Sequence, residues 1–420
     1  MKILILHTVP YRKIEYHRAL DHAAHDVTYV GVEARIADLP ADLRCEKIVI
    51  PGVAEPAVEI GAIASPADGY EMVMALSEFD LHEAGKVREH LGVPGPRYGD
   101  LLRFKDKILM KRLVAAAGLR VPRSLDLRTA ERTAEKSAAA ASVPWEGRTI
   151  LKPTLGASSV GVHVFGSPRE ALAFVARPEN HEYFADGELE QFIEGPILHV
   201  DGVMEGGIPR LIVASRYIST PLEYAWGEPL GSAQFRMSDG YRAFFLGCLR
   251  AVGVVDGAFH LEVIEGPEEL VFMEVANRAG GGDIIPTTEA STGVHIPTEE
   301  IDVLIRAQAR RLGRPLPGGP VREVTKTEGP WFGWLVVPGH HFPEASCRVT
   351  TPDWLAGSGA VVKLRVAQPP DRLKKSVTHQ YWEVPAAAIL RGGDDAEVVE
   401  VVRRLREEIR VVPRAAEVAR

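Results

Sequence analysis

A lysine followed by a loop of small residues is the strongest candidate for chemistry in this sequence. Lys152 ends a strand-like run of apolar and β-branched residues in the stretch TILKPTLGASSVGVHVF, residues 149–165. Small residues let backbone N–H groups approach phosphate oxygens closely, and a lysine supplies the positive charge that those oxygens attract. The pattern is not a Walker A loop, because no Gly-Lys-Ser/Thr follows at the required spacing. It therefore predicts a nucleotide triphosphate site under a flap between two strands; an ordinary hairpin turn is the alternative.

A second cluster places acids where a metal could bind. Residues 259–283, FHLEVIEGPEELVFMEVANRAGGGD, read as two strands joined by a turn. Side chains alternate along a strand, so Glu274 and Arg278 share one face of the second strand, and Glu262 would converge on them if the strands pair. Two such carboxylates repel each other unless a cation lies between them, and oxygen ligands suit Mg2+. An exposed hairpin with solvated acids is the alternative.

The surrounding pattern predicts several α/β units. In the first 100 residues, strand-like runs alternate with helical stretches: strands at 2–6, 26–32, 46–51 and 70–76, and a helix at 82–92. Asp106 and Gly118 bound a further helix, and another is expected over 130–142. A βαβ-like series is expected over 185–310. After a Pro/Gly/Arg linker, a mainly β block begins near Val321 and ends in a charged helix at 396–410.

Length, net charge and cysteine count argue against several classes of protein. A chain of 420 residues is too long for one ordinary core. The formal net charge of -8 argues against nucleic acid or an acidic membrane as partner. The three cysteines are far apart, which supports neither a disulfide framework nor a zinc knuckle. No apolar run is long enough to span a membrane, so we expect a cytoplasmic protein.

Taken together, these motifs resemble the ATP-grasp superfamily, in particular the carboxylate-amine ligases of dipeptide and natural-product biosynthesis. The ordered matches are FKDKILMKRLVAAAGLRVP, ILKPTLGASSVGVHVF, LEQFIEGPILHVDG, and HLEVI with MEVANRAGGGD. The resemblance implies an α/β (α+β) class and an ATP-grasp fold with a two-lobed nucleotide-binding core. The expected parts are an N-terminal α/β lobe at 1–100, a small lobe with the flap at 101–190, a large lobe with the metal site at 191–312, and a mainly β lobe at 313–420.

The resemblance also implies roles for individual residues. It assigns the α/β-phosphates to Lys107 and Lys152, and the closing flap to Gly156, Ser158, Ser159 and Gly161. It assigns adenine recognition to Glu190 and to the backbone at Phe192 and Ile193. It assigns Mg2+, with Mn2+ as an alternative, to Glu262 and Glu274, and the γ-phosphate and the acyl phosphate to Arg278. Lys152 and Arg278 would thus be catalytic. For the substrate carboxylate we expect the backbone of Gly280, Gly281 and Gly282, together with Arg216 and Arg278.

Two positions depart from the family pattern. Ile197 stands where many members have a ribose-binding glutamate, and His199 or Asp201, on the same strand face, could replace it. Ala276 stands where many members have a metal-binding asparagine, and Asn277 should point to the opposite face. We therefore expect fewer protein ligands to Mg2+, which tolerates several waters.

The implied activity is ATP-dependent joining of a carboxylate, activated as an acyl phosphate, to an amine such as an amino acid, with release of ADP and phosphate. The alternatives are a carboxylate-thiol ligase that loads a carrier protein, a kinase, and a non-catalytic nucleotide-binding regulator. We expect residues 215–245 to wall the substrate pocket, and Trp331 to Trp334 to be core packing. The sequence identifies neither substrate. It also leaves the oligomeric state open, with a homodimer as one option.

Overall fold

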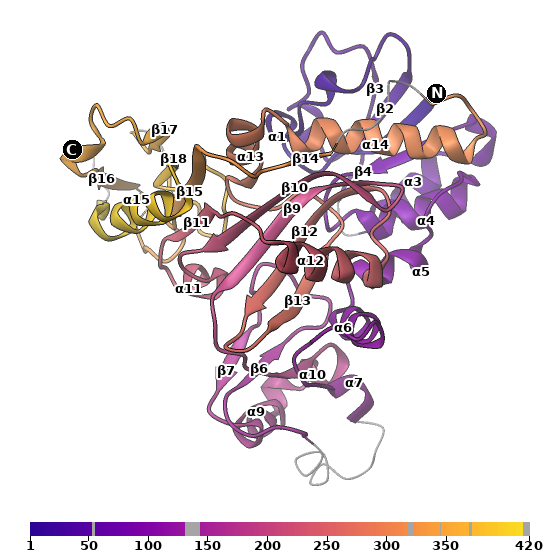
Figure 1. Ribbon diagram of the computed structural model, residues 1–420. Coiled ribbons are helices and arrows are strands. Elements are labelled where there is room, and N and C mark those ends of the chain that lie inside the picture. Colours follow the sequence, from indigo (N-terminus) through magenta and orange to yellow (C-terminus); the bar gives the residue numbers. More distant parts are fainter. Residues whose placement is uncertain (53–54, 131–142, 317–322, 345, 369–371, 415–420) are drawn as a thin grey trace, which may run out of the picture.

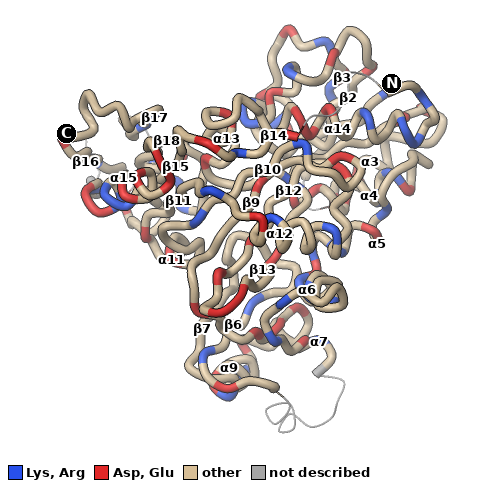
Figure 2. Tube along the Cα trace, in the orientation of Figure 1, with Lys and Arg blue, Asp and Glu red and all other residues tan. Residues whose placement is uncertain are grey.

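The computed structural model (Figure 1) describes residues 1–52, 55–130, 143–316, 323–344, 346–368 and 372–414. The helix expected over 130–142 lies almost wholly outside these residues. The described strands form four sheets, and basic and acidic residues are interspersed over all parts of the trace (Figure 2). No helix of the described residues is long and apolar enough to cross a membrane.

The N-terminal sheet is parallel, as the strand-helix alternation predicts. Its order is β3-β2-β1-β4, with strands β1 (Lys2–Leu6), β2 (Asp26–Gly31), β3 (Glu46–Val49) and β4 (Met72–Ala75). Its helices are α1 (Tyr11–Ile14), α2 (Glu33–Ile36), α3 (Pro56–Ile63), α4 (Leu81–Leu91) and α5 (Tyr98–Leu101). Helix α4 ends at Gly92, whose φ of 69° is a left-handed conformation that glycine adopts at little cost.

A small antiparallel sheet carries the predicted flap. Its order is β5-β8-β6-β7, with β5 (Ser124–Asp126), β6 (Thr149–Lys152), β7 (His163–Phe165) and β8 (Glu188–Gln191). Helices α7 (Leu127–Ala130), α9 (Pro168–Val175) and α10 (Glu182–Ala185) lie beside it, and Leu151, Leu189 and Tyr183 are among its core residues. The flap is thus the loop of a β6–β7 hairpin, as predicted.

Helix α6 (Lys107–Ala116) begins as predicted, because the Asp106 side chain caps it by accepting a hydrogen bond from the Leu109 N–H at 3.0 Å. Its buried side chains, Met110 and Val114, belong to the core of the large sheet. The helix therefore packs on the large sheet, while its first residue, Lys107, reaches the flap through its N–H, which donates to the Thr154 carbonyl at 3.1 Å.

The large sheet has nine described strands. Its order is β13-β12-β9-β10-β11-β15-β18-β17. The strands are β9 (Ile197–Glu205), β10 (Ile208–Tyr217), β11 (Leu230–Gln234), β12 (Gly257–Glu265), β13 (Leu270–Ala276), β15 (Trp331–Val337), β17 (Val361–Val366) and β18 (Ala386–Gly392). These strands pair antiparallel, and the short β14 (Val324–Thr325) joins β10 in parallel.

The antiparallel pairing corrects one prediction. The βαβ-like series expected over 185–310 is wrong, because β9 and β10 are joined by the two glycines Gly206 and Gly207, a turn too short for a parallel crossover. The C-terminal strands β15, β18 and β17 extend the same sheet. The four-part division of the chain remains a prediction, but its last two parts share one continuous sheet.

Helices cover both faces of the large sheet. Core residues of α12 (Asp239–Val252) pack on one face, and α15 (Asp395–Glu408) packs further along it against β11, β15 and β18. On the other face lie α13 (Ile284–Thr292) and α14 (Ile296–Arg311), and Ile301 and Ile305 of α14 also enter the core of the N-terminal sheet. Helix α14 therefore joins the two sheets. The described residues also form α11 (Pro221–Ala225) and the pair β16 (Ser346–Thr350) with β19 (Arg410–Arg414). Short 3-10 helices lie at Tyr16–Arg18, Pro66–Asp68, Leu102–Phe104, Pro178–Asn180 and Asp353–Leu355.

Candidate active site

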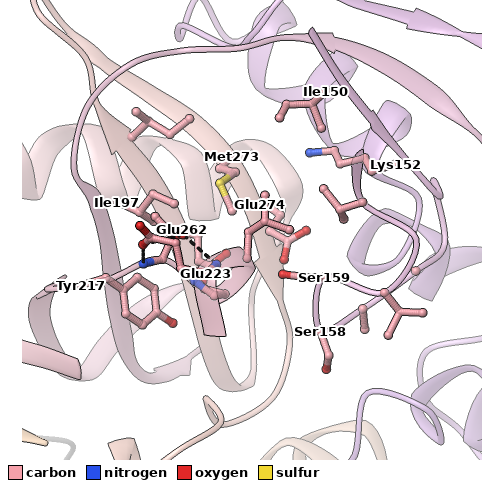
Figure 3. Close-up of a pocket in the computed structure, with 18 of the residues that line it drawn as sticks. Ile150, Lys152, Ser158, Ser159, Ile197, Tyr217, Glu223, Glu262, Met273 and Glu274 are labelled. Carbon is pink, nitrogen blue, oxygen red and sulfur yellow. Dashed lines mark hydrogen bonds between the residues drawn. The ribbon is translucent and has the colours of Figure 1, made fainter. Parts of the chain in front are cut away.

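A cavity of about 430 Å³ lies between the small sheet and the uncovered part of the large sheet. Lys152, Ser158 and Ser159 face it from the flap side, and Glu262 and Tyr217 face it from the large sheet (Figure 3). Most of the predicted site residues line it: Lys107, Lys152, Gly156, Ser158, Ser159, Glu190, Phe192, Ile193, Glu262, Glu274, Arg278, Gly281 and Gly282. The fold thus brings the two chemical clusters of the sequence to one place.

Lys152 belongs to a buried network of two lysines and two glutamates. Its Nζ lies 3.0 Å from Glu190 Oε2 and 3.7 Å from Glu188 Oε1, and Lys111 Nζ lies 2.5 Å and 2.7 Å from the same two groups. Burial opposes the charge on Lys152, but the neighbouring carboxylates raise its pKa above the usual range. The ammonium group therefore stays positive at the edge of the cavity.

The two predicted metal ligands stand opposite each other. Strands β12 and β13 pair with Glu262 directly across from Glu274, and a bulge follows this pair. Burial alone would raise the pKa of the Glu274 carboxyl, but Lys107 and Lys152 lower it to about 2. Glu274 is therefore an anion at neutral pH, and the oxygen set fits a hard divalent cation such as Mg2+.

Lys107 links the flap to this pair. Its Nζ donates a hydrogen bond to the Gly156 carbonyl at 2.6 Å and lies 3.2 Å from Glu274 Oε2. The backbone of Ser158 and Ser159 is left-handed, with φ of 57° and 58°. Such non-glycine conformations cost on the order of 1 kcal/mol each and cluster at functional loops.

Arg278 meets the cavity from the end of β13 and is held by the N-terminal part of the chain. Its Nε and Nη2 lie 2.8 Å and 2.5 Å from Glu78 Oε2. Glu78 follows β4, and Lys105 lies 3.8 Å from its other oxygen. The loop after β4 thus orients Arg278, to which the family resemblance assigns the γ-phosphate.

Four predicted residues do not line the cavity. Arg216 pairs with Glu265 at 2.6 Å, and the next residue, Tyr217, faces the cavity instead. The ring of His199 is engaged inside the sheet, 2.6 Å from Asp201 Oδ2 and 2.6 Å from Ser232 Oγ. Gly161 takes the turn of the flap at a φ of 72°, and its carbonyl accepts the Tyr183 hydroxyl proton at 2.8 Å.

The fourth predicted residue that does not line the cavity, Gly280, packs against the buried side chains of Asp201 and His260. A Cβ there would lie 2.5 Å from Asp201 Oδ1 and 2.9 Å from His260 Nδ1. Asp201 in turn lies 2.8 Å from His260 Nδ1, and His260 Nε2 lies 3.4 Å from Glu262. Asn277, as expected, points away: its amide donates to the Ala258 carbonyl at 2.7 Å.

Sequence reasoning missed several residues of the site. Lys111 could have been predicted from the sequence, because it lies four residues after Lys107 and therefore on the same face of that helix. Trp334 and His379 could not have been predicted, because they reach the cavity from C-terminal strands and loops that are distant in the sequence. Trp334 is buried, as predicted, but its ring also lines the cavity. Ile150, Ile264 and Met273 are further lining residues that were missed, whereas Glu223 and Trp226 line the cavity from the segment predicted as the substrate wall.

The overall fold, with a flap on a small antiparallel sheet that faces a large one, is an ATP-grasp fold. Similar solved structures confirm the fold. An L-amino acid ligase from Bacillus licheniformis has a TM-score of 0.69 and 15% identity, with 98% of each chain covered. The biotin carboxylase domain of a Hydrogenobacter thermophilus 2-oxoglutarate carboxylase has a TM-score of 0.65 and 16% identity, covering 98% of this chain and 90% of that one. The N5-carboxyaminoimidazole ribonucleotide synthetase of Thermotoga maritima has a TM-score of 0.61 and 14% identity, covering 98% and 99%.

Curated sequences agree with this result over part of their length. The L-arginine-specific L-amino acid ligase of Bacillus subtilis is 22% identical over 268 residues, which cover 59% of this chain and 61% of that protein. An uncharacterized protein of Sinorhizobium fredii is 26% identical over 251 residues, covering 56% and 49%. The matched part of the chain thus spans 61% and 49% of the length of these two relatives. No protein family model matches the sequence.

Proposed function

We propose that the chain is an ATP-dependent, ADP-forming ligase that activates a small carboxylate as an acyl phosphate and joins it to an amine. The observation that carries the proposal is the cross-strand pair of Glu262 and Glu274, with the ammonium groups of Lys107 and Lys152 facing the same cavity. Two anions for a divalent cation and two cations for a triphosphate match the charges of MgATP. The names of the similar proteins favour amino acids as substrates.

The nucleotide would lie between the sheets. Apolar side chains on both sides, Ile150 and Phe192 from the small sheet and Ile264 and Met273 from the large one, can enclose a purine. The Phe192 N–H already donates to the Arg148 carbonyl at 3.1 Å. We therefore expect the Ile193 N–H to meet the purine edge.

The chain's own groups would then serve the chemistry. Mg2+ bound at Glu262 and Glu274 would neutralise charge on the transferring phosphoryl group. Arg278, fixed by Glu78, would contact the same charge and the acyl phosphate. The flap at Ser158 and Ser159 would exclude water, which otherwise hydrolyses the acyl phosphate. The backbone at Gly281 and Gly282 would hold the substrate carboxylate.

The test is a screen of pooled amino acids and other carboxylates with ATP and Mg2+, read as ADP release and followed by mass analysis of the product. We expect ADP release that requires both a carboxylate and an amine, and a product with an amide bond. A stable phosphoester would identify a kinase, and a thioester on a carrier protein would identify a thiol ligase. ADP release that no carboxylate changes would refute the proposal.

A further inference from the structure

A second cavity, of about 460 Å³, lies where the N-terminal sheet meets the large sheet. It is lined by β4 and α4, by the segment that joins α5 to α6, by the start of β12 and by the end of α14. It shares no lining residue with the candidate active site. Three arginines from three different elements face it: Arg88, Arg103 and Arg311.

Arg88, on α4, has only neutral partners. Its guanidinium donates to the carbonyls of Val73 at 2.8 Å and Pro96 at 3.1 Å. Among the described residues no carboxylate lies within ion-pair distance of it. Burial and the positive charges of Arg311 and Arg97 lower the pKa of Arg88 to about 10. The cavity therefore holds positive charge that the protein leaves without a counterion.

Arg103 and Arg311 add to this charge. Arg103 Nε is buried without a hydrogen-bond partner, and no described carboxylate pairs with its side chain. Arg311 has one distant carboxylate, Asp256, at 3.6 Å. The Arg103 guanidinium therefore has no described carboxylate partner, and an anion in the cavity would pair with it.

The acids of the cavity do not neutralise these arginines. Asp256 is already paired with Arg310 at 2.7 Å. Glu300 is buried, and its Oε1 accepts the Ala258 N–H at 3.2 Å. Burial raises the pKa of Glu300 to about 8, so its carboxyl is mostly neutral at pH 7. The third acid of the lining, Asp100, accepts a hydrogen bond from the Arg97 N–H at 2.9 Å. With Glu300 neutral, the three arginines face two carboxylates, so the net charge is positive.

Met72, Leu101, Phe104 and Leu304 form the apolar part of the lining, and the amide side chains of Asn277 and Gln308 also face the cavity. We propose that this cavity is a second ligand site, which binds a small organic anion through a phosphate or carboxylate group on Arg103 and Arg311 and through apolar contact with Phe104. Guanidinium groups bind both kinds of anion in a two-pronged geometry. The volume exceeds the needs of a bare inorganic ion and falls in the range of small-molecule sites.

The test is calorimetric titration of the full chain with two probes, citrate for carboxylates and ribose 5-phosphate for phosphates. We expect at least one probe to bind with one-to-one stoichiometry and a Kd below about 1 mM. Arg103→Gln and Arg311→Gln should each weaken that binding about tenfold or more. Arg112→Gln is the matched control. The Arg112 side chain is exposed on α6, and its ion pair with Asp126 is long, at 3.8 Å. The tighter probe would show which anionic group the site prefers.

Two independent arginine variants keep the test decisive if one of them fails to fold, which circular dichroism would reveal. Arg88 is not a suitable target, because it also ties two backbone segments together. The proposal is overturned if neither probe saturates at millimolar concentration. Binding that is as tight in the folded Arg103 and Arg311 variants as in the wild type would also overturn it.

Discussion

Lys107 and Glu274 lie 3.2 Å apart across the candidate active site, and the same Lys107 ammonium donates to the Gly156 carbonyl of the flap. One cation thus connects the flap with a proposed metal ligand. A divalent cation on Glu274 would take over this charge compensation and leave Lys107 to contact a phosphate. The flap, Lys107 and Glu274 are therefore coupled through the contacts of one ammonium group.

The first prediction concerns Glu274. Glu274→Gln keeps the shape but removes the anion, so we expect ADP formation to fall at least about 100-fold with the fold intact. Glu269→Gln on the same hairpin is the control, because its exposed carboxylate pairs with Arg120 away from the cavity. ADP release and circular dichroism are the measurements. Turnover by Glu274→Gln equal to that of the control would rule out the metal assignment.

The second prediction concerns Lys111. This lysine is 2% exposed and pairs with Glu188 and Glu190. Lys111→Met leaves buried carboxylates undercompensated, so we expect a loss of about 3 kcal/mol in the free energy of unfolding. Adding Glu188→Gln should recover part of the loss, which urea unfolding of both variants would measure. Additive losses in the double variant would contradict the assigned pairing.

The third prediction separates two neighbouring glycines. Gly282 has a φ of 58°, and a Cβ there would lie 2.9 Å from the Trp334 ring, whereas a Cβ on Gly281 meets nothing within 4 Å. Gly282→Ala should therefore cost about 1–2 kcal/mol of stability and raise the KM for the carboxylate. Gly281→Ala should behave like the wild type in thermal unfolding. Equal effects of the two changes would show that the Trp334 contact does not shape the site.

The fourth prediction is a pH dependence at Glu300. Burial raises its pKa to about 8 in the folded chain, above the usual value of a carboxyl group, so the folded chain binds a proton more tightly than the unfolded chain. Stability is therefore lost as the pH rises from about 5 to about 8, by at most about 1.4 kcal/mol per pH unit. Glu300→Gln removes this penalty and can still accept the Ala258 N–H.

Urea unfolding at several pH values would check this. The stability of Glu300→Gln relative to the wild type should grow from pH 5 to pH 8. A difference that stays constant over this range would show that Glu300 is ionised in the folded chain.

The sequence alone predicted the parts of the site that depend on local pattern. The strand that ends in Lys152, the flap loop, the cap at Asp106 and the facing of Glu262 and Glu274 all follow from side-chain alternation, turn residues and capping. Where the pattern was ambiguous by one residue, it failed: Arg216 was expected in the site, but Tyr217 faces it.

Only the tertiary structure decided which distant segments meet. Arg278 is held by Glu78, 200 positions away, and Trp334 and His379 complete the cavity from strands and loops that extend the large sheet. The antiparallel order of that sheet was likewise not readable from helix and strand alternation. Residue spacing determines what a segment presents to its neighbours, but the pairing of strands and the packing of helices on them determine which neighbours it has.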